Sequence, residues 1–246
     1  MTKHYAATNP GKIRKNNEDS FFSTEYENYG IYILADGMGG YQGGEEASRI
    51  AVETAYSCFK KAIDKEELQT SLEIKEKIKD IIARVNKKIL LVASKSEELK
   101  NMGTTMVVAI TKDDIVYYSS VGDSRMYLLR KNEILSQVTV DDTFINKLIS
   151  DGVITQEEAE KHPQRHVLTK AVGIAKKIET EENEIQLEKG DVLLLCSDGV
   201  TNMVDEKNIE RILKNSKNSD TAIDLIAEAN NNGGQDNITA VVITNY

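Results

Sequence analysis

The sequence predicts an α+β domain in which antiparallel sheets are covered by helices. Helical and strand patterns occur in blocks along the chain, without the steady strand–helix–strand alternation of a parallel sheet. The strand candidates are short, rich in β-branched residues and tyrosine, and separated by turn residues. The 246 residues include only two prolines and no linker-like stretch, so we expect a single domain over residues 1–246.

The first part of the chain predicts a strand and two helices. Residues 31–35 form a short apolar run that ends in a glycine-dense turn at 36–40. After Gly43 and Gly44, apolar residues recur at helical spacing as far as Ala62, and a longer helical pattern covers 74–92. Each pattern has one apolar face, which predicts that both helices pack against a sheet.

The rest of the chain predicts further strands and helices. Short strands at 104–110, 115–121, 126–130 and 133–138 indicate an antiparallel meander. A polar, helical stretch follows at 142–172. Two buried strands are expected at 192–196 and 238–244, with helices at 206–214 and 219–230 between them.

Composition excludes several partners. The formal charge of −9 argues against DNA, RNA or an anionic membrane as the main partner, because those need a surplus of Lys and Arg. No apolar run approaches the roughly 20 residues of a membrane-spanning helix, and the polar first residues lack a signal-peptide core. We therefore expect a cytoplasmic protein. Cys58 and Cys196 fall in helix and strand patterns and are expected to be reduced core residues.

Four segments share one feature, an apolar strand that meets a turn at an aspartate. The aspartates of these four segments are Asp36, Asp123, Asp198 and Asp236. A strand end holds a short carboxylate rigidly, and a neighbouring glycine lets a backbone carbonyl face the same point. Oxygen ligands suit Mg²⁺ or Mn²⁺, and two such ions about 3.5–4 Å apart activate a water molecule. One Asp-Gly pair alone is ordinary turn chemistry, so the hypothesis depends on all four.

A charged segment near the N-terminus places Arg14 four residues before Glu18 and Asp19. Arginine binds phosphate through two parallel hydrogen bonds and keeps its charge, as a phosphomonoester site requires. Most short charge clusters are solvated surface, however, and this segment alone favours that interpretation.

Taken together, these motifs resemble the protein phosphatase 2C family of metal-dependent phosphatases, specifically its compact bacterial members. The resemblance extends over essentially the whole chain, with motifs in family order at 14–19, 36–40 with 44–48, 103–105, 121–125, 197–199 and 234–239. It implies a four-layer α/β/β/α sandwich with two central antiparallel β-sheets flanked by helices. The metals are then expected at one end of the sandwich.

The resemblance also implies the roles of the site residues. Asp36 would bridge two catalytic ions, Mn²⁺ or Mg²⁺. Asp198 and Asp236 would complete the ligands of one of these ions. The Gly37 carbonyl would bind the other, and Glu18 would reach it through water. Asp123 and Asp198 would hold a third, weaker ion. Arg14 would bind the substrate phosphate. The activated water then attacks phosphorus in line, so that phosphoserine or phosphothreonine is hydrolysed without a phosphoenzyme.

The implied substrates are phosphorylated proteins, including a cognate bacterial serine/threonine kinase and its targets. We expect a monomer that binds neither nucleic acid nor membrane. The stretch at about 141–170 matches the mobile flap beside the site in bacterial members, and it is expected to influence substrate choice.

The sequence departs from the family pattern at several positions. Met38 replaces the histidine proposed as general acid in eukaryotic members, and Tyr41 stands where bacterial relatives often have histidine. Asp142 and Thr143 replace the more usual His-Ser pair. The chain's own histidines are expected to be structural or surface residues: His4 just before the first strand, and His162 and His166 in the flap.

The sequence lacks the motifs of other phosphatase classes and of nucleotide-binding folds. Neither cysteine begins a Cys-x-x-x-x-x-Arg loop, and no Asp-x-Asp motif follows Asp141. Gln42 occupies the third glycine position of a dinucleotide motif. The serious alternative is a catalytically silent phosphatase-like binding domain, but every carboxylate expected of an active enzyme is present.

Overall fold

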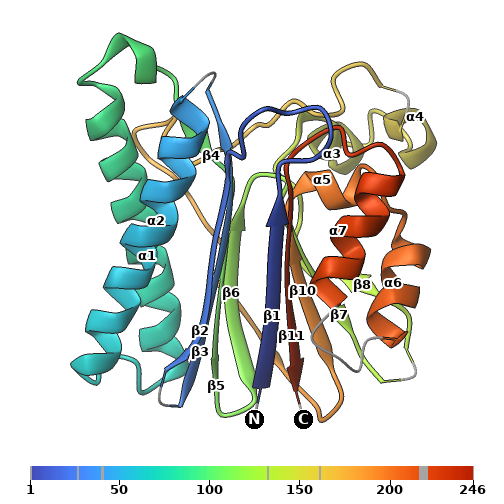
Figure 1. Cartoon of the computed structure of the whole chain (residues 1–246). Helices are drawn as coiled ribbons and strands as arrows, with labels where there is room; N and C mark the ends of the chain where they lie inside the picture. The colour runs from blue at the N-terminus through green and yellow to red at the C-terminus, as the bar shows by residue number, and fades with distance from the viewer. Residues whose placement is uncertain are drawn as a thin grey trace.

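The computed structural model describes residues 2–26, 28–39, 42–131, 133–160, 162–215 and 221–245. These residues form four layers, with two antiparallel sheets face to face and helices on both outer faces (Figure 1). The predicted α+β sandwich is confirmed. The predictions for Gly40, Tyr41 and residues 219 and 220 lie outside the described residues. Within the described residues, no helix is long and apolar enough to cross a membrane.

The first sheet has six strands. Five follow the order β2 (Asp19–Tyr26), β3 (Tyr29–Met38), β5 (Met106–Lys112), β6 (Ile115–Val121) and β9 (Asn183–Gln186), and β4 (Gly103–Thr104) pairs with the end of β3. The second sheet has the order β1 (Thr2–Asn9), β11 (Ile238–Asn245), β10 (Val192–Cys196), β7 (Arg125–Leu129) and β8 (Ser136–Gln137). All pairs within both sheets are antiparallel.

Strand β3 shows why the layers form. Ile31 and Ile33 belong to the apolar core between the first sheet and its helices, whereas Tyr32 and Leu34 belong to the core between the two sheets. Successive side chains of a strand point to opposite faces, so a continuous apolar run is buried on both sides. The sheet is therefore covered on each face.

The outer layers consist of two helix pairs. Helices α1 (Gly43–Asp64) and α2 (Ser71–Ala93) cover the first sheet, and α6 (Glu206–Asn215) and α7 (Thr221–Asn231) cover the second (Figure 1). Helix α2 begins where Thr70 and Glu73 form a capping box, an interaction typically worth about 1 kcal/mol. The predicted helices at 47–62, 74–92 and 206–214 are confirmed.

The stretch predicted to be helical at 142–172 contains only two short helices, α3 (Phe144–Ser150) and α4 (Gln156–Glu160). They lie over one end of the sandwich, opposite the end where the chain termini lie (Figure 1). We call residues 141–170 the flap. Its two ends are joined by backbone hydrogen bonds, from Thr169 N to Asp142 O at 2.8 Å and from Phe144 N to Val167 O at 2.8 Å.

The predicted meander is wrong in one respect, because the chain changes sheets between β6 and β7. Gly122 has a φ of +97°, and a Cβ at this position would lie 2.7 Å from Thr105 Cγ2. Glycine therefore permits a sharp turn toward the second sheet where a hairpin was expected. The strand predicted at 133–138 is reduced to Ser136–Gln137.

Other local predictions also need correction. His4 lies inside β1, which the sequence did not predict, and β2 and β9 were missed as well. Asp36 lies within β3, two residues before its end, because Gly37 and Met38 pair with Thr104 and Gly103 of β4. The remaining short helices are α5 (Asp198–Thr201) and the 3₁₀ turn Glu97–Leu99.

Candidate metal centre and phosphate site

The predicted site residues meet at the flap end of the sandwich. Arg14 and Glu18 come from the loop before β2, and Asp36 and Gly37 come from β3. Asp123 lies in the β6–β7 turn, Asp198 at the start of α5, and Asp236 in the loop before β11. Desolvation raises the pKa of Asp36, and the charges of Asp198, Asp123 and Asp236 raise it further, as neighbouring carboxyl groups do.

Strand β4 and the residue after it fix the backbone of Asp36. Asp36 N donates to Thr105 Oγ1 at 2.9 Å, and Asp36 O accepts from Thr104 Oγ1 and from Thr105 N, each at 2.8 Å. Thr105 Oγ1 also lies 2.7 Å from Ser124 Oγ in the β6–β7 turn. The two threonines therefore connect the Asp36 segment to the turn that carries Asp123.

Crowded carboxylates dominate the electrostatics of the site. Desolvation, and then the charges of Asp19 and Asp198, hold the pKa of Asp36 well above its usual range. Desolvation and the charge of Asp236 likewise raise the pKa of Asp198. For Asp123, desolvation followed by the charge of Asp198 raises the pKa to about 7. Burial and mutual repulsion both disfavour the charged form, so these groups need a positive partner to ionise fully.

Glu18 and Gly37 lie where β3 meets the first turn of α1. Gly37 N donates to Glu18 O at 3.1 Å. A Cβ on Gly44 would lie only 2.0 Å from Glu18 Oε2 and 2.8 Å from Gly37 O, so the Glu18 carboxylate and the Gly37 carbonyl share one small space. Burial raises the pKa of Glu18, and the Arg14 charge partly offsets this effect.

Arg14 lies at the exposed edge of the site. Its Nη2 donates to Asp236 Oδ2 at 2.9 Å, and the two side chains are 55% and 36% exposed. Asn237 fixes the loop that carries Arg14, because its side chain accepts from Glu18 N at 2.7 Å and donates to Pro10 O and Asn16 O. An arginine has five N–H donors, so the contact through Nη2 leaves others for phosphate oxygens.

Asp19 is a residue of the site that the sequence prediction did not include. It is buried and pairs with Asp36 across β2 and β3, and its Oδ2 accepts from Ser197 Oγ at 2.8 Å and Thr239 Oγ1 at 2.6 Å. Burial raises its pKa to about 7 against the effect of both hydroxyls. Its position beside Glu18 was the available signal, but its partners are about 180 or more residues away in the sequence.

A cavity of about 160 Å³ lies between the site and the flap. Its lining includes Asp123 and Asp198 from the site and Arg165 and His166 from the flap. The charge of His166 favours the ionised form of Asp198, opposing desolvation, which raises the Asp198 pKa. His166 was predicted to be structural or a surface residue, and it is exposed beside this cavity.

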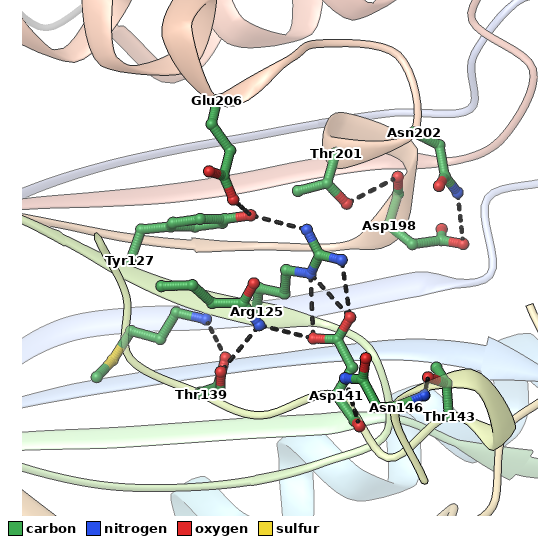
Figure 2. A network of polar contacts seen from close by, with 12 residues as sticks. Arg125, Tyr127, Thr139, Asp141, Thr143, Asn146, Asp198, Thr201, Asn202 and Glu206 are labelled. Atoms are coloured by element: carbon green, nitrogen blue, oxygen red, sulfur yellow. Dashed lines mark hydrogen bonds and ion pairs between the residues drawn. The ribbon is translucent and has the colours of Figure 1, made fainter. Parts of the chain in front are cut away.

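Another wall of this cavity includes an ion pair between Arg125, which is partly exposed, and Asp141, which is buried. Figure 2 shows the pair. Arg125 Nε lies 3.0 Å from both carboxylate oxygens of Asp141, and Nη2 lies 2.8 Å from Asp141 Oδ2. Arg125 Nη1 also donates to Tyr127 OH at 2.9 Å. Asn202 and Asp198 also line this cavity, and Asn202 Nδ2 donates to Asp198 Oδ2 at 2.9 Å (Figure 2).

The residues present fit divalent cations. In the described part of the chain, no cluster of three or more His, Cys, Asp and Glu side chains is already arranged around one point. Even so, Asp198 Oδ1 and Asp19 Oδ1 are buried without a hydrogen-bond partner among the described residues, and the neighbouring carboxyl groups repel one another. Oxygen donors that lack positive partners are what Mg²⁺ or Mn²⁺ requires. Asp36, Asp198 and Asp236 would hold such ions.

Comparisons with known proteins agree with this geometry. Residues 12–230 match the family model described as protein phosphatase 2C. The serine/threonine phosphatase stp of Listeria monocytogenes is 40% identical over 239 residues, which cover 96% of this chain and 93% of that protein.

Two solved structures are also similar. The S. agalactiae serine/threonine phosphatase has a TM-score of 0.90 at 32% identity, with 100% of each chain covered. The catalytic domain of the phosphatase PstP in complex with two manganese ions has a TM-score of 0.84 at 31% identity, with 99% of this chain and 97% of that chain covered. The chain belongs to the protein phosphatase 2C family.

Proposed function

We propose that this protein is a metal-dependent protein serine/threonine phosphatase. The observation that carries the proposal is the convergence of Asp36, Asp198 and Asp236 beside Arg14 at one end of the sandwich. Relatives named serine/threonine phosphatases match nearly the whole chain, and PstP binds two manganese ions. Mn²⁺ or Mg²⁺ is therefore the proposed cofactor, with two catalytic ions and a third, weaker one at Asp123 and Asp198.

Each residue has a separate task in this proposal. Asp36, Asp198 and Asp236 would supply the negative charge for the catalytic ions, and Glu18 and the Gly37 carbonyl, which lie together beside Gly44, would add further oxygen ligands. When bound, the ions lower the pKa of a water molecule and balance the charge that develops on the phosphoryl oxygens.

The substrate is held and released by other groups. Arg14 donates to the phosphate oxygens from the exposed edge of the site, where a phosphoprotein can approach. Met38 has no proton to give, so the proton for the departing serine or threonine oxygen comes from another group. The flap lies beside this entrance, and we propose that it influences which phosphoproteins are accepted.

The proposal extends to the partners, the oligomeric state, the location and the domain organisation of the protein. A cognate serine/threonine kinase and its targets are the proposed partners, since a phosphatase of this type opposes a kinase that acts on the same hydroxyl groups. A monomeric state and a cytoplasmic location remain predictions from the sequence. A single phosphatase domain with its flap is the proposed organisation of residues 1–246.

The decisive experiment measures Mn²⁺-dependent hydrolysis of a phosphothreonine peptide. Chelation of the metal should abolish turnover. Asp36→Ala and Asp198→Ala should each lower kcat/KM by more than the roughly 10–100-fold typical of losing a residue that supports a metal ligand. Asp80→Ala is the matched control, because Asp80 is an exposed aspartate on α2, and it should behave as wild type.

The same experiment separates the two classes of function. Equal rates for wild type and Asp36→Ala would refute the assignment. Tight binding of Mn²⁺ by the wild type without any turnover would instead favour the silent binding domain.

A further inference from the structure

A second cavity, of about 270 Å³, lies between β6, the two ends of the flap and the segment before β9. We call it the side groove. Its lining includes Tyr118 and Ser120 of β6, Val140 and Asp142 at the start of the flap, and Glu179 and Glu181 before β9. The side groove is distinct from the cavity that contains Asp123 and Asp198, and the proposed reaction makes no use of it.

The edge of β6 is open along part of the side groove. Strand β9 pairs with β6 only as far as Tyr118, which lies opposite Asn183. Beyond that point, residues 119–121 pair with β5 on one side, and within the described residues no strand pairs with them on the other. An open strand edge presents N–H and C=O groups to which an extended chain can bind as an added strand.

The segment before β9 makes the side groove acidic. Glu179 and Glu181 line it, are exposed, and form no ion pair within the described part of the chain. Among the described residues of the lining, Lys170 is the one cation, and its Nζ lies 3.0 Å from Asp142 Oδ1. Three carboxylates and one ammonium group leave a net negative charge, which is complementary to lysine and arginine side chains.

One short segment separates the side groove from the metal centre. Thr139 and Asp142 line the side groove. Asp141, which lies between them in the chain, lines the cavity that also includes Asp123 and Asp198. The two cavities therefore lie against the same stretch of backbone, and a single bound polypeptide can occupy both.

We propose that the side groove is a docking site for a basic, extended segment of the phosphoprotein substrate. The open edge of β6 would pair with the backbone of that segment, and Glu179 and Glu181 would pair with its lysine or arginine side chains. The substrate is the favoured occupant because the side groove shares a wall with the metal centre. This choice of occupant rests on the proposed function.

The first test compares phosphothreonine peptides with the same central sequence. One ends close to the phosphothreonine, and the others carry an arginine-rich extension at the N-terminal or the C-terminal end. A docking site away from the reacting atoms binds substrate and transition state equally, so it lowers KM and leaves kcat unchanged. In the wild type, KM should be about three- to tenfold lower for one of the extended peptides, as expected for two exposed ion pairs.

The double variant Glu179→Gln, Glu181→Gln should lose this preference. Its KM for the extended peptide should rise nearly to that for the short peptide, whose kinetics should stay as in the wild type. The double variant Glu66→Gln, Asp224→Asn is the matched control. It removes the same charge from two exposed carboxylates, one between α1 and α2 and one on α7, and should keep the preference.

The second test needs no turnover. An unphosphorylated arginine-rich peptide added to the wild type should shift the NMR amide signals of Ser120 and Asn183, and leave that of Asp224 on α7 unchanged. A peptide with glutamate in place of arginine should shift none of them. Added salt should weaken the binding, because exposed charges are screened. The arginine-rich peptide should also inhibit hydrolysis of the extended phosphopeptide, but not of p-nitrophenyl phosphate.

The outcomes separate this inference from the proposed function. Equal KM values for the short and extended peptides in the wild type would overturn it, as would a preference that survives in the Glu179→Gln, Glu181→Gln variant. Amide shifts at Ser120 without inhibition of the extended phosphopeptide would overturn the substrate as the occupant. Loss of the preference in the variant, together with amide shifts in the wild type, would support the inference. Peptide binding by a wild type that shows no turnover would support the side groove as a peptide site and contradict the proposed function.

Discussion

Arg14 has one observed partner and one proposed partner, and the two make opposite demands on its charge. It forms an ion pair with Asp236, which is proposed to hold a catalytic ion, and it is proposed to bind the substrate phosphate. A guanidinium beside a carboxylate competes with a metal cation for the same negative charge. In its proposed role, Arg14 would therefore favour phosphate binding and oppose metal binding.

Arg14→Ala should change these two affinities in opposite directions. KM for a phosphothreonine peptide should rise by about tenfold or more, the loss expected for a charge-assisted hydrogen bond, with a smaller fall in kcat. Mn²⁺ should bind slightly tighter, by a factor of about two, because the competing pair is exposed. Steady-state kinetics and calorimetry measure both, and the exposed neighbour Lys15→Ala serves as control. An unchanged KM would contradict the role of Arg14.

At the scale of elements, the contact between β3 and α1 determines where Glu18 lies. A Cβ on Gly37 would lie 2.0 Å from Gly44 O, so the strand and the first turn of the helix touch backbone to backbone. Only glycines allow this approach. The Glu18 carboxylate then occupies the remaining space beside Gly44.

Gly44→Ala tests this contact. Alanine normally stabilises a helix relative to glycine by up to about 1 kcal/mol. Here the added methyl group would overlap Glu18 Oε2 and the Gly37 backbone, so we expect a net destabilisation of about 1–3 kcal/mol. Chemical denaturation measures it, and phosphatase activity should fall as well. Gly43→Ala is the control, because its Cβ would meet only the Met102 side chain and backbone, at 3.1 Å or more. Equal stability of the two variants would contradict the argument.

The elements with strong periodicity were predictable, and the change of sheet was not. Helix α2 has a regular apolar face and a capping box, both of which are local signals. Strands β6 and β7 each resemble one arm of a hairpin, because period-two patterns are the same in either sheet. The φ angle of Gly122 and its contact with Thr105 decide the path, and these depend on residues that are distant in the sequence.

At the scale of the whole molecule, Asp19 joins the two sheets beneath the site. It belongs to β2 in the first sheet, and its hydrogen bonds reach Ser197 after β10 and Thr239 in β11 of the second. The aspartates that follow or precede apolar strands were recognisable from the sequence. Asp19 was not, since the residues that make it part of the site come from the other sheet.

Asp19 also predicts how stability depends on pH when metal is chelated. Burial raises its pKa from 3.8 to about 7, so the folded protein retains a proton that the unfolded chain loses. The unfolded state therefore binds fewer protons between about pH 4 and pH 7, and stability falls as pH rises through this window. In Asp19→Asn, the fall in Tm from pH 5 to pH 7.5 should be smaller by at least about 2–4 °C.

Thermal unfolding in the presence of chelator measures this difference. Asp123 contributes in the same direction, so some slope remains in the variant. An identical pH slope in wild type and Asp19→Asn would show that the Asp19 proton is not retained on folding.

The division of the site between two sheets has a consequence for kinetics. Asp36 comes from the first sheet, whereas Asp198 and Asp236 adjoin strands of the second, so the proposed ligands come together only after the sheets have docked. Interactions that form after the transition state slow unfolding and leave the rate of folding nearly unchanged. Bound metal should therefore lengthen the lifetime of the folded protein without helping it to fold.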